Sequence, residues 1–282
     1  MTGSLFVHKA AYASPINMGI DRTRVEFSAR PGDTIHGIIV LSNDTAAPVP
    51  IHVQSADFEP QGEDGKVAMG TQNPAHSLKD WITPTQTDLV APGRAKIPID
   101  FDVHVPPGAK SGAYWGIIIL KNPSHFDLAP IVLVNVLGEA QEKLTVASFE
   151  ETTSATGALT FTARFKNDGD LYEKPKSTIT IKNFLGQTVA ETKLPPENIL
   201  PGAIRRFITI IPINLGPGPY KATLKTTYGE KPQEQGQEVE ASTQLWIKPK
   251  PTPATATVAS IPLILLTALA WALARQKKSV TP

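Results

Sequence analysis

Six histidines are the first residues of this sequence to test for acid–base or metal chemistry. They are His8, His36, His52, His76, His104 and His125. None stands two or four residues from another, so the sequence contains no local metal-binding pair of histidines. Three of them, His36, His52 and His104, fall within strand-like runs, where a solvent-facing or satisfied core histidine is the usual role. A metal trio assembled across strands stays open as the alternative.

Pairs of acidic residues are the second group, and they are Asp100/Asp102, Glu63/Asp64, Asp168/Asp170 and Glu150/Glu151. Asp100 and Asp102 alternate with apolar residues, which is typical of a solvated strand face. Residues 167–170 resemble part of a calcium loop but lack its downstream glutamate, so the pattern favours a turn. No serine-hydrolase, phosphate-loop or dinucleotide fingerprint is found in the sequence. We therefore predict no catalytic residue, no metal site and no cofactor, with carboxylates that converge in space as the open enzymatic alternative.

Three aromatic residues, Trp81, Tyr114 and Trp115, are the candidate ligand-binding residues. Exposed aromatic rings can stack on sugars. Tyr114 and Trp115 are adjacent in a strand-like run, so their side chains should point to opposite faces, one into the core and one outward or over an edge. The alternative is that both tryptophans are core residues, as a tryptophan often is in a sandwich. Asn43 heads a glycosylation-like Asn-Asp-Thr sequence, for which the pattern favours an Asx turn.

Composition excludes several classes of function. The chain has 282 residues and a net charge of +1, so it lacks the basic excess of a nucleic-acid-binding protein. Cysteine is absent, which excludes disulfides, thiol nucleophiles and cysteine-ligated zinc. The 26 prolines and 20 glycines are spread along the chain and punctuate short β-branched and aromatic runs, a pattern typical of many short strands.

An uncharged apolar run at 258–274 predicts a single transmembrane helix. Its anchor residues include Val258, Leu265, Leu269, Trp271 and Ala274. The basic residues that follow it are Arg275, Lys277 and Lys278. Because basic flanks stay in the cytoplasm, residues 275–282 should form a cytoplasmic tail and the rest of the chain should lie outside the cell membrane. The proline-rich residues 249–257 should form a stiff linker between the ectodomain and the helix.

Residues 1–13 resemble the end of a signal peptide. Ala11 and Ala13 fit the small-x-small cleavage pattern, with Ser14 as the first residue of the mature chain. The alternative is an ordinary disordered N-terminus. A mature chain that starts at Ser14 would support processing.

The region between these ends predicts an all-β fold with two tandem Ig-like β-sandwich domains, at 14–142 and 143–248, followed by the transmembrane helix. In the first half, strand-like runs occupy 24–30, 34–41, 49–56, 78–82, 95–105, 113–120 and 131–137. In the second half they occupy 159–166, 177–182, 206–213, 220–227 and 244–247. The halves repeat specific features: an Asn-Asp turn at Asn43 and at Asn167, and a Pro-Gly pair followed by Tyr114 or by Tyr220.

Residues 19–120 resemble the N-terminal domain of the WxL-interacting proteins of Gram-positive-type cell surfaces. The resemblance is carried by the runs 27–34, 42–44, 78–82, 89–93, 105–108 and 112–116. It implies a first domain that binds peptidoglycan and a second domain that binds the WxL domain of a partner protein. The shared layout is two β-sandwiches, a C-terminal transmembrane helix and a short basic tail.

These observations predict a single-pass, membrane-anchored surface protein that attaches to cell-wall glycan, to another surface protein, or to both. The expected partners are the membrane, peptidoglycan and a surface protein, and nucleic acid is not among them. Two alternatives stay open: a pilus-type assembly chaperone with two sandwiches, and a passive structural spacer. A membrane-tethered hydrolase is the least favoured.

Overall fold

The computed structural model describes residues 18–70, 74–122, 127–153, 158–213, 215–229 and 236–248. The predicted signal-peptide remnant and cleavage site, the linker at 249–257, the transmembrane helix at 258–274 and the tail at 275–282 all lie outside these residues. Within the described part of the chain, no helix is long and apolar enough to cross a membrane.

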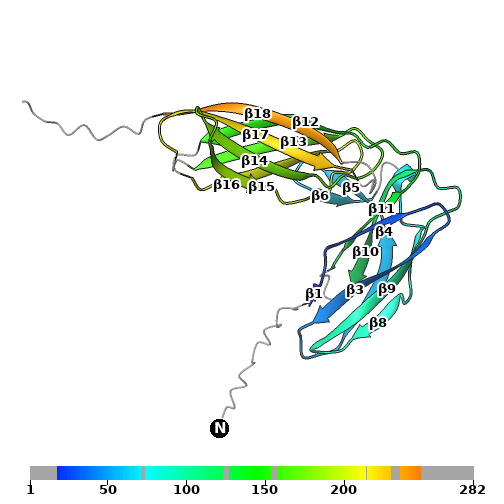
Figure 1. Cartoon of the computed structure of the whole chain (residues 1–282). Helices are drawn as coiled ribbons and strands as arrows, with labels where there is room; N and C mark the ends of the chain where they lie inside the picture. Colours follow the sequence, from blue (N-terminus) through cyan, green and yellow to red (C-terminus); the bar gives the residue numbers. More distant parts are fainter. Residues whose placement is uncertain are drawn as a thin grey trace, which may run out of the picture.

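The described chain is all-β, as predicted, and its strands form two sets that do not pair with each other (Figure 1). The first set comprises β1 (Met18–Ile20), β2 (Arg24–Ala29), β3 (Thr34–Asn43), β4 (Val49–Ala56), β5 (Phe58–Gln61), β6 (Lys66–Met69), β7 (Ile82–Pro84), β8 (Asp88–Ala91), β9 (Ala95–His104), β10 (Gly112–Lys121) and β11 (Ile131–Val136). The 3₁₀ helix η1 (Pro74–His76) is its one described helical element. The second set comprises β12 (Leu144–Thr153), β13 (Leu159–Asn167), β14 (Lys176–Asn183), β15 (Thr188–Lys193), β16 (Ile204–Ile211), β17 (Gly218–Tyr228) and β18 (Gln237–Ile247).

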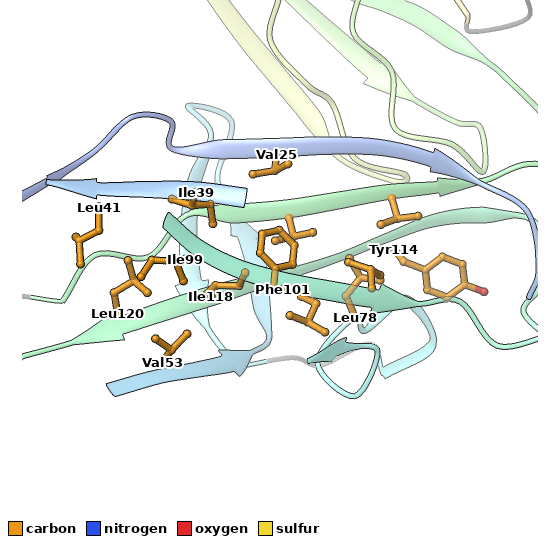
Figure 2. Close-up of a cluster of buried hydrophobic side chains, with 14 of the residues drawn as sticks. Val25, Ile39, Leu41, Val53, Leu78, Ile99, Phe101, Tyr114, Ile118 and Leu120 are labelled. Atoms are coloured by element: carbon orange, nitrogen blue, oxygen red, sulfur yellow. The ribbon is translucent and has the colours of Figure 1, made fainter. Parts of the chain in front are cut away.

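The first set forms a sandwich of a β1-β3-β9-β7 sheet and a β2-β11-β10-β4-β8 sheet. All its pairs are antiparallel except β2 with β11, which run parallel. Alternation along each strand sends one set of side chains inward. Ile39 and Phe101 from one sheet meet Val53 and Ile118 from the other in a continuous buried core (Figure 2). The apolar residues that alternate with Asp100 and Asp102 on β9 therefore face this core, as the alternation predicted.

The second set forms a β12-β13-β16 sheet and a β15-β14-β17-β18 sheet. Phe161 and Phe207 from the first of these meet Ile179 and Leu224 from the second in a core of its own. Strands β3, β9, β10 and β11 of the first domain occupy the same places as β13, β16, β17 and β18 of the second.

Two details mark the internal repeat at the level of single residues. Asn43 and Asn167 each end a strand, are fully buried, and donate from their amides to a carbonyl four residues on and to a second, distant carbonyl. Tyr114 and Tyr220 each donate from the hydroxyl to the carbonyl four residues before, at 3.0 and 3.1 Å. This corner bond is characteristic of Ig-like sandwiches.

The predicted strand at 78–82 is wrong for most of its length. Leu78 to Trp81 form a turn, in which the Trp81 and Ile82 amides both donate to the Leu78 carbonyl, and β7 starts at Ile82. Leu78 is fully buried as the anchor of this turn, while Lys79 and Asp80 are exposed. A single buried leucine before two charged residues fits a turn as well as it fits an alternating strand.

Candidate interdomain binding site

The three aromatic residues singled out in the sequence lie on both faces of β10. Tyr114 enters the core of the first domain, and Trp115 points to the opposite face of the sheet, which confirms their predicted alternation. The Trp115 indole donates to the Phe58 carbonyl at 3.0 Å and stacks on His76, with ring centroids 4.6 Å apart. Trp81 is half-buried against Tyr114.

Sugar stacking, which was predicted for these rings, does not fit two of the three positions. Tyr114 is 9% exposed and Trp115 is 5% exposed, so neither offers a free ring face. Tyr114 is buried in the core of the first domain, and Trp115 is buried because the β5–β6 hairpin and the second domain cover the outer face of β10. The role of Trp81 in ligand binding stays a prediction.

Among the described histidines, His36, His52 and His104 are exposed, while His76 is half-buried against Trp115. His36 on β3 lies 3.0 Å from Asp102 and 3.3 Å from Asp100 on the outer face of β9. The hydrogen bond to Asp102 raises the pKa of His36 above its usual value. Residues 167–170 form the predicted turn, in which Asn167 accepts from the Gly169 amide. The described residues contain no group of three such side chains placed to hold a metal ion.

The two domains meet over an apolar cluster that belongs to neither sandwich core. Trp115, Ile117 and Leu133 from the outer face of β10 and β11 pack with Tyr172 and Leu200 of the second domain. The Tyr172 amide donates to the Asn135 side chain at 3.0 Å, and the Ala113 amide donates to the Asp170 carbonyl at 2.7 Å. These contacts join the outer face of a first-domain sheet to the near end of the second domain.

The β5–β6 hairpin reaches from the first domain to the second and adds a charged clamp (Figure 1). Arg164 on β13 forms a bidentate pair with Glu63, and Arg206 on β16 pairs with Asp64 at 2.8 Å. The hydrogen bond from Arg164 lowers the pKa of Glu63. The Arg206 amide also donates to the Glu63 carbonyl at 2.8 Å, so the hairpin tip caps the start of β16.

A crevice of about 290 Å³ lies inside this junction. It is bounded by the β5–β6 hairpin, by the β2 and β11 strands, and by the 197–205 segment that leads into β16. Its apolar lining includes Phe58, Ile131, Leu133 and Leu200. Such a combination of an apolar lining and a few polar groups is typical of a ligand site at a domain boundary.

Cations outnumber anions in the lining. Arg24 and Arg205 share the Glu197 carboxylate, at 3.2 and 3.4 Å. Lys66 lines the same crevice, so three cationic side chains and one carboxylate line it, and Arg24 also pairs with Glu26 at 2.7 Å. Burial lowers the pKa of Arg205, and the nearby charge of Arg24 acts in the same direction, against the opposing effect of Glu197. An anionic group in the crevice would relieve this repulsion.

Asn198 gives an independent sign of a missing partner. The residue is 6% exposed and lines the crevice. Its side-chain nitrogen and oxygen are both buried and make no hydrogen bond to any described residue. A buried amide without partners costs free energy, so this wall of the crevice would gain free energy if the Asn198 side chain turned to meet a polar group in the crevice. Guanidinium groups and an amide donor together suit a carboxylate on an otherwise apolar chain.

Sequence reasoning missed this site. Arg24 and Arg205 lie 181 residues apart, and the acidic partner and Asn198 follow two prolines in a stretch that reads as a loop. The one available signal is the adjacent Arg205 and Arg206 at the start of an apolar strand, where two cations in succession are unusual. The β5–β6 hairpin, which forms one wall, carries little apolar alternation.

No protein-family model matches the sequence, and no curated protein matches it. Solved structures that resemble the chain include the class 5 fimbriae chaperone CfaA, at 11% identity over 80% of this chain and 98% of that one, with a TM-score of 0.41. The E. coli chaperone DraB matches at 16% identity over 83% and 98%, with a TM-score of 0.37. The CsuC–CsuE chaperone-tip adhesion subunit complex of Acinetobacter baumannii matches at 11% identity over 79% and 97%, with a TM-score of 0.39. At these identities and TM-scores, similarity does not carry function from those proteins to this chain.

Proposed function

We propose that this chain is a non-enzymatic, membrane-anchored protein of the cell surface that binds a carboxylate-bearing segment of another surface protein. The observation that supports the proposal best is the interdomain crevice, in which Arg24, Arg205 and Lys66 outnumber Glu197 and the buried Asn198 amide lacks a partner. The apolar lining would hold the side chains of the segment, and the guanidinium groups would hold its carboxylate.

Anchoring and wall binding are the parts of the proposal that come from the sequence. The uncharged run at 258–274 and its basic flank support a single-pass anchor with the sandwiches outside the cell. Resemblance to the WxL-interacting proteins supports a first domain that attaches to peptidoglycan. The full chain should therefore sediment with insoluble peptidoglycan sacculi in a saturable way, and failure to do so would remove wall binding from the proposal.

Calorimetric titration of the full chain in nanodiscs tests the crevice. The probe is an acetylated pentapeptide of alternating valine and threonine, made with a free C-terminal carboxylate and as the amide. We expect the carboxylate form to bind at least tenfold more tightly, because a charge-assisted pair contributes about 1.5–3 kcal/mol. Arg205→Ala should remove this preference. Arg22→Ala, a matched control at an exposed arginine paired with Asp21, should leave it unchanged. Equal binding of both peptide forms would contradict a carboxylate site.

An assembly chaperone is the second candidate, and one observation favours it. β16 is the last strand of its sheet, whereas β9, in the same place in the first domain, is covered by β7. Since the Arg206 amide points away from β13 to Glu63, alternation directs the amides of Ile208 and Ile210 outward too. Such an edge can pair with a strand of a client protein. β11, by contrast, has a neighbour on both sides, so it is not free to be donated.

Two substitutions at one position separate this candidate from the first. Ile208→Pro removes an outward amide and blocks strand addition, whereas Ile208→Thr removes the same apolar side chain and keeps the amide. A chaperone would lose co-purification of an otherwise unstable subunit with Ile208→Pro and keep it with Ile208→Thr. Identical behaviour of both variants would exclude strand addition at β16.

A further inference from the structure

The end of the second domain away from the crevice carries unusually exposed apolar side chains. Phe184 and Leu185, at the tip of the β14–β15 hairpin, are 76% and 66% exposed, and Trp246, near the end of β18, is 68% exposed. The tip is held in place by Asn183, whose side-chain oxygen accepts from the Leu185 and Gln187 amides. A fixed turn that directs two large apolar groups into water needs an explanation.

Strand pairing places these side chains in one row. Asn183 stands opposite Tyr220, and Tyr220 stands opposite Leu245. One position further, Pro219 stands opposite Trp246, and Phe184 begins the turn that follows Asn183 at the end of β14. Adjacent strands lie about 4.8 Å apart, so the Asn183 and Leu245 backbones are separated by roughly 10 Å across β17. The apolar groups therefore form one surface at one end of the sandwich.

Lysines flank this surface within the β15-β14-β17-β18 sheet. Lys182 and Lys221 face each other one position further into the sheet, and Lys248 follows the end of β18. The described segments 182–187, 216–221 and 244–248, which make up this end of the sheet, contain no Asp or Glu. Aromatic residues flanked by lysines are the composition of a surface that sits at the lipid–water boundary, with an attraction for anionic headgroups.

The chain leaves the second domain at the same end of the sandwich. β18 finishes at Ile247, beside Trp246, and ten residues separate Ile247 from Val258, the first residue of the apolar run. A proline-rich stretch of that length spans at most about 31 Å in an extended polyproline conformation. An anchored chain would therefore keep this end of the second domain close to the bilayer surface.

We infer that Phe184, Leu185 and Trp246, with Lys182, Lys221 and Lys248, form a docking surface for an anionic lipid headgroup layer. The inference rests on the membrane anchoring in the proposed function and extends it, because it adds a second attachment to the bilayer. Docking of this end would fix the orientation of the ectodomain and hold the crevice away from the membrane, at the opposite end of the second domain.

Fluorescence quenching in vesicles tests the inference on the full chain. The sequence contains no cysteine, so Thr188→Cys introduces a single labelling site at the start of β15, beside the hairpin tip. Lys193→Cys places the matched control label at the other end of β15, about 17 Å further along the strand. Both labels carry an environment-sensitive dye, and the vesicles contain phosphatidylcholine, phosphatidylglycerol and a headgroup-nitroxide lipid as the quencher.

Quenching at position 188 should exceed that at 193 several-fold. It should fall to the level at 193 in the Phe184→Ser/Trp246→Ser background, and weaken in pure phosphatidylcholine. The control Met69→Ser/Val90→Ser, which removes two exposed apolar groups of the first domain, should change nothing. Equal quenching at 188 and 193 in a chain that floats with the vesicles and resists carbonate extraction would overturn the docking surface alone. A chain that fails to float would overturn the membrane anchor instead.

Discussion

At the scale of single residues, two buried asparagines close the ends of equivalent strands. Asn167 donates to the Leu171 carbonyl at 2.7 Å and to the Ile199 carbonyl at 2.8 Å. Removing its amide leaves two carbonyls and the Gly169 amide without their partner in a buried site. The same bonding pattern recurs at Asn43 and Asn167, so we expect the closure of each sandwich to depend on it.

Asn167→Ala should therefore lower the free energy of unfolding by about 3 kcal/mol, since each buried group left unpaired costs about 1–3 kcal/mol. Asn198→Ala is the control, because that amide has no partner among the described residues, and it should cost less than about 1 kcal/mol. Urea denaturation followed by circular dichroism measures both. Similar losses for the two variants would show that the Asn167 bonds do not stabilise the fold.

The stability of the folded chain should depend on pH through His36. Its hydrogen bond to Asp102 raises the pKa above 6.5, so the folded state binds a proton more tightly than the unfolded state. The resulting stabilisation is present below pH 6.5 and is lost as the pH rises through the folded-state pKa. NMR titration should show a His36 pKa above 6.5 that falls in Asp102→Asn. Asp88→Asn, which removes the partner of His52, should leave it unchanged. If the pKa of His36 stays the same in Asp102→Asn, a group other than Asp102 raises it.

At the scale of elements, β3 and β9 fit together because Gly37 on β3 leaves room for the ring of Phe101, its partner on β9. A Cβ added at Gly37 would lie 2.3 Å from the ring of Phe101, which is fully buried on the facing strand. Gly37→Ala should cost about 2 kcal/mol, the usual cost of overpacking. Phe101→Leu should partly relieve the clash, so the double variant should be more stable than the sum of the single losses predicts. Gly108→Ala is the control, since its Cβ would meet nothing within 4 Å. Additive losses in thermal denaturation would refute the contact.

The strands that alternation predicted well are the ones that fill the sandwich cores. β4 has the predicted bounds, and β9, β10 and β11 differ from the prediction by a residue or two, because their inward side chains are uniformly apolar. β1, β8, β12, β15 and the β5–β6 hairpin were missed, and only the last four residues of β18 were predicted. β12 carries a bulge between Val146 and Ser148 and ends in Glu150, Glu151 and threonines, so its alternation is interrupted. The β5–β6 hairpin packs mainly through Phe58, which alternation alone cannot distinguish from an isolated apolar residue.

The candidate site was less predictable than the fold for a physical reason. Alternation reports whether a side chain is inside or outside one sheet, and the crevice forms where the outer face of one sandwich meets the end of another. Trp115 belongs to that outer face, and its burial depends on contacts with residues far along the chain. Its orientation away from the core was predictable, and its partner was not.

At the scale of the whole molecule, the crevice exists only while the two domains keep their relative placement. That placement depends on the apolar cluster around Trp115 and Tyr172 and on the paired charges of the β5–β6 hairpin. Exposed ion pairs contribute little by themselves, about 0–1 kcal/mol each. The buried aromatic cluster should therefore contribute most of the free energy that holds the two domains together. The ion pairs should fix the orientation of one domain relative to the other.

Tyr172→Ala is expected to uncouple the domains. The side chain is 3% exposed, it packs on the first-domain sheet, and its hydroxyl reaches the Phe27 carbonyl. Its loss should reduce the interdomain free energy by about 3–5 kcal/mol, the usual cost of truncating a buried aromatic residue. Calorimetry should then resolve two unfolding transitions where the unaltered chain shows one.

Phe161→Leu, in the core of the second domain, is the control. It should lower the transition temperature relative to the unaltered chain without splitting the transition. Peptide binding in the crevice should fall with Tyr172→Ala and persist with Phe161→Leu, because the crevice needs both of its walls. A single transition in Tyr172→Ala would show that the clamp of Glu63 and Asp64 is sufficient to hold the domains together.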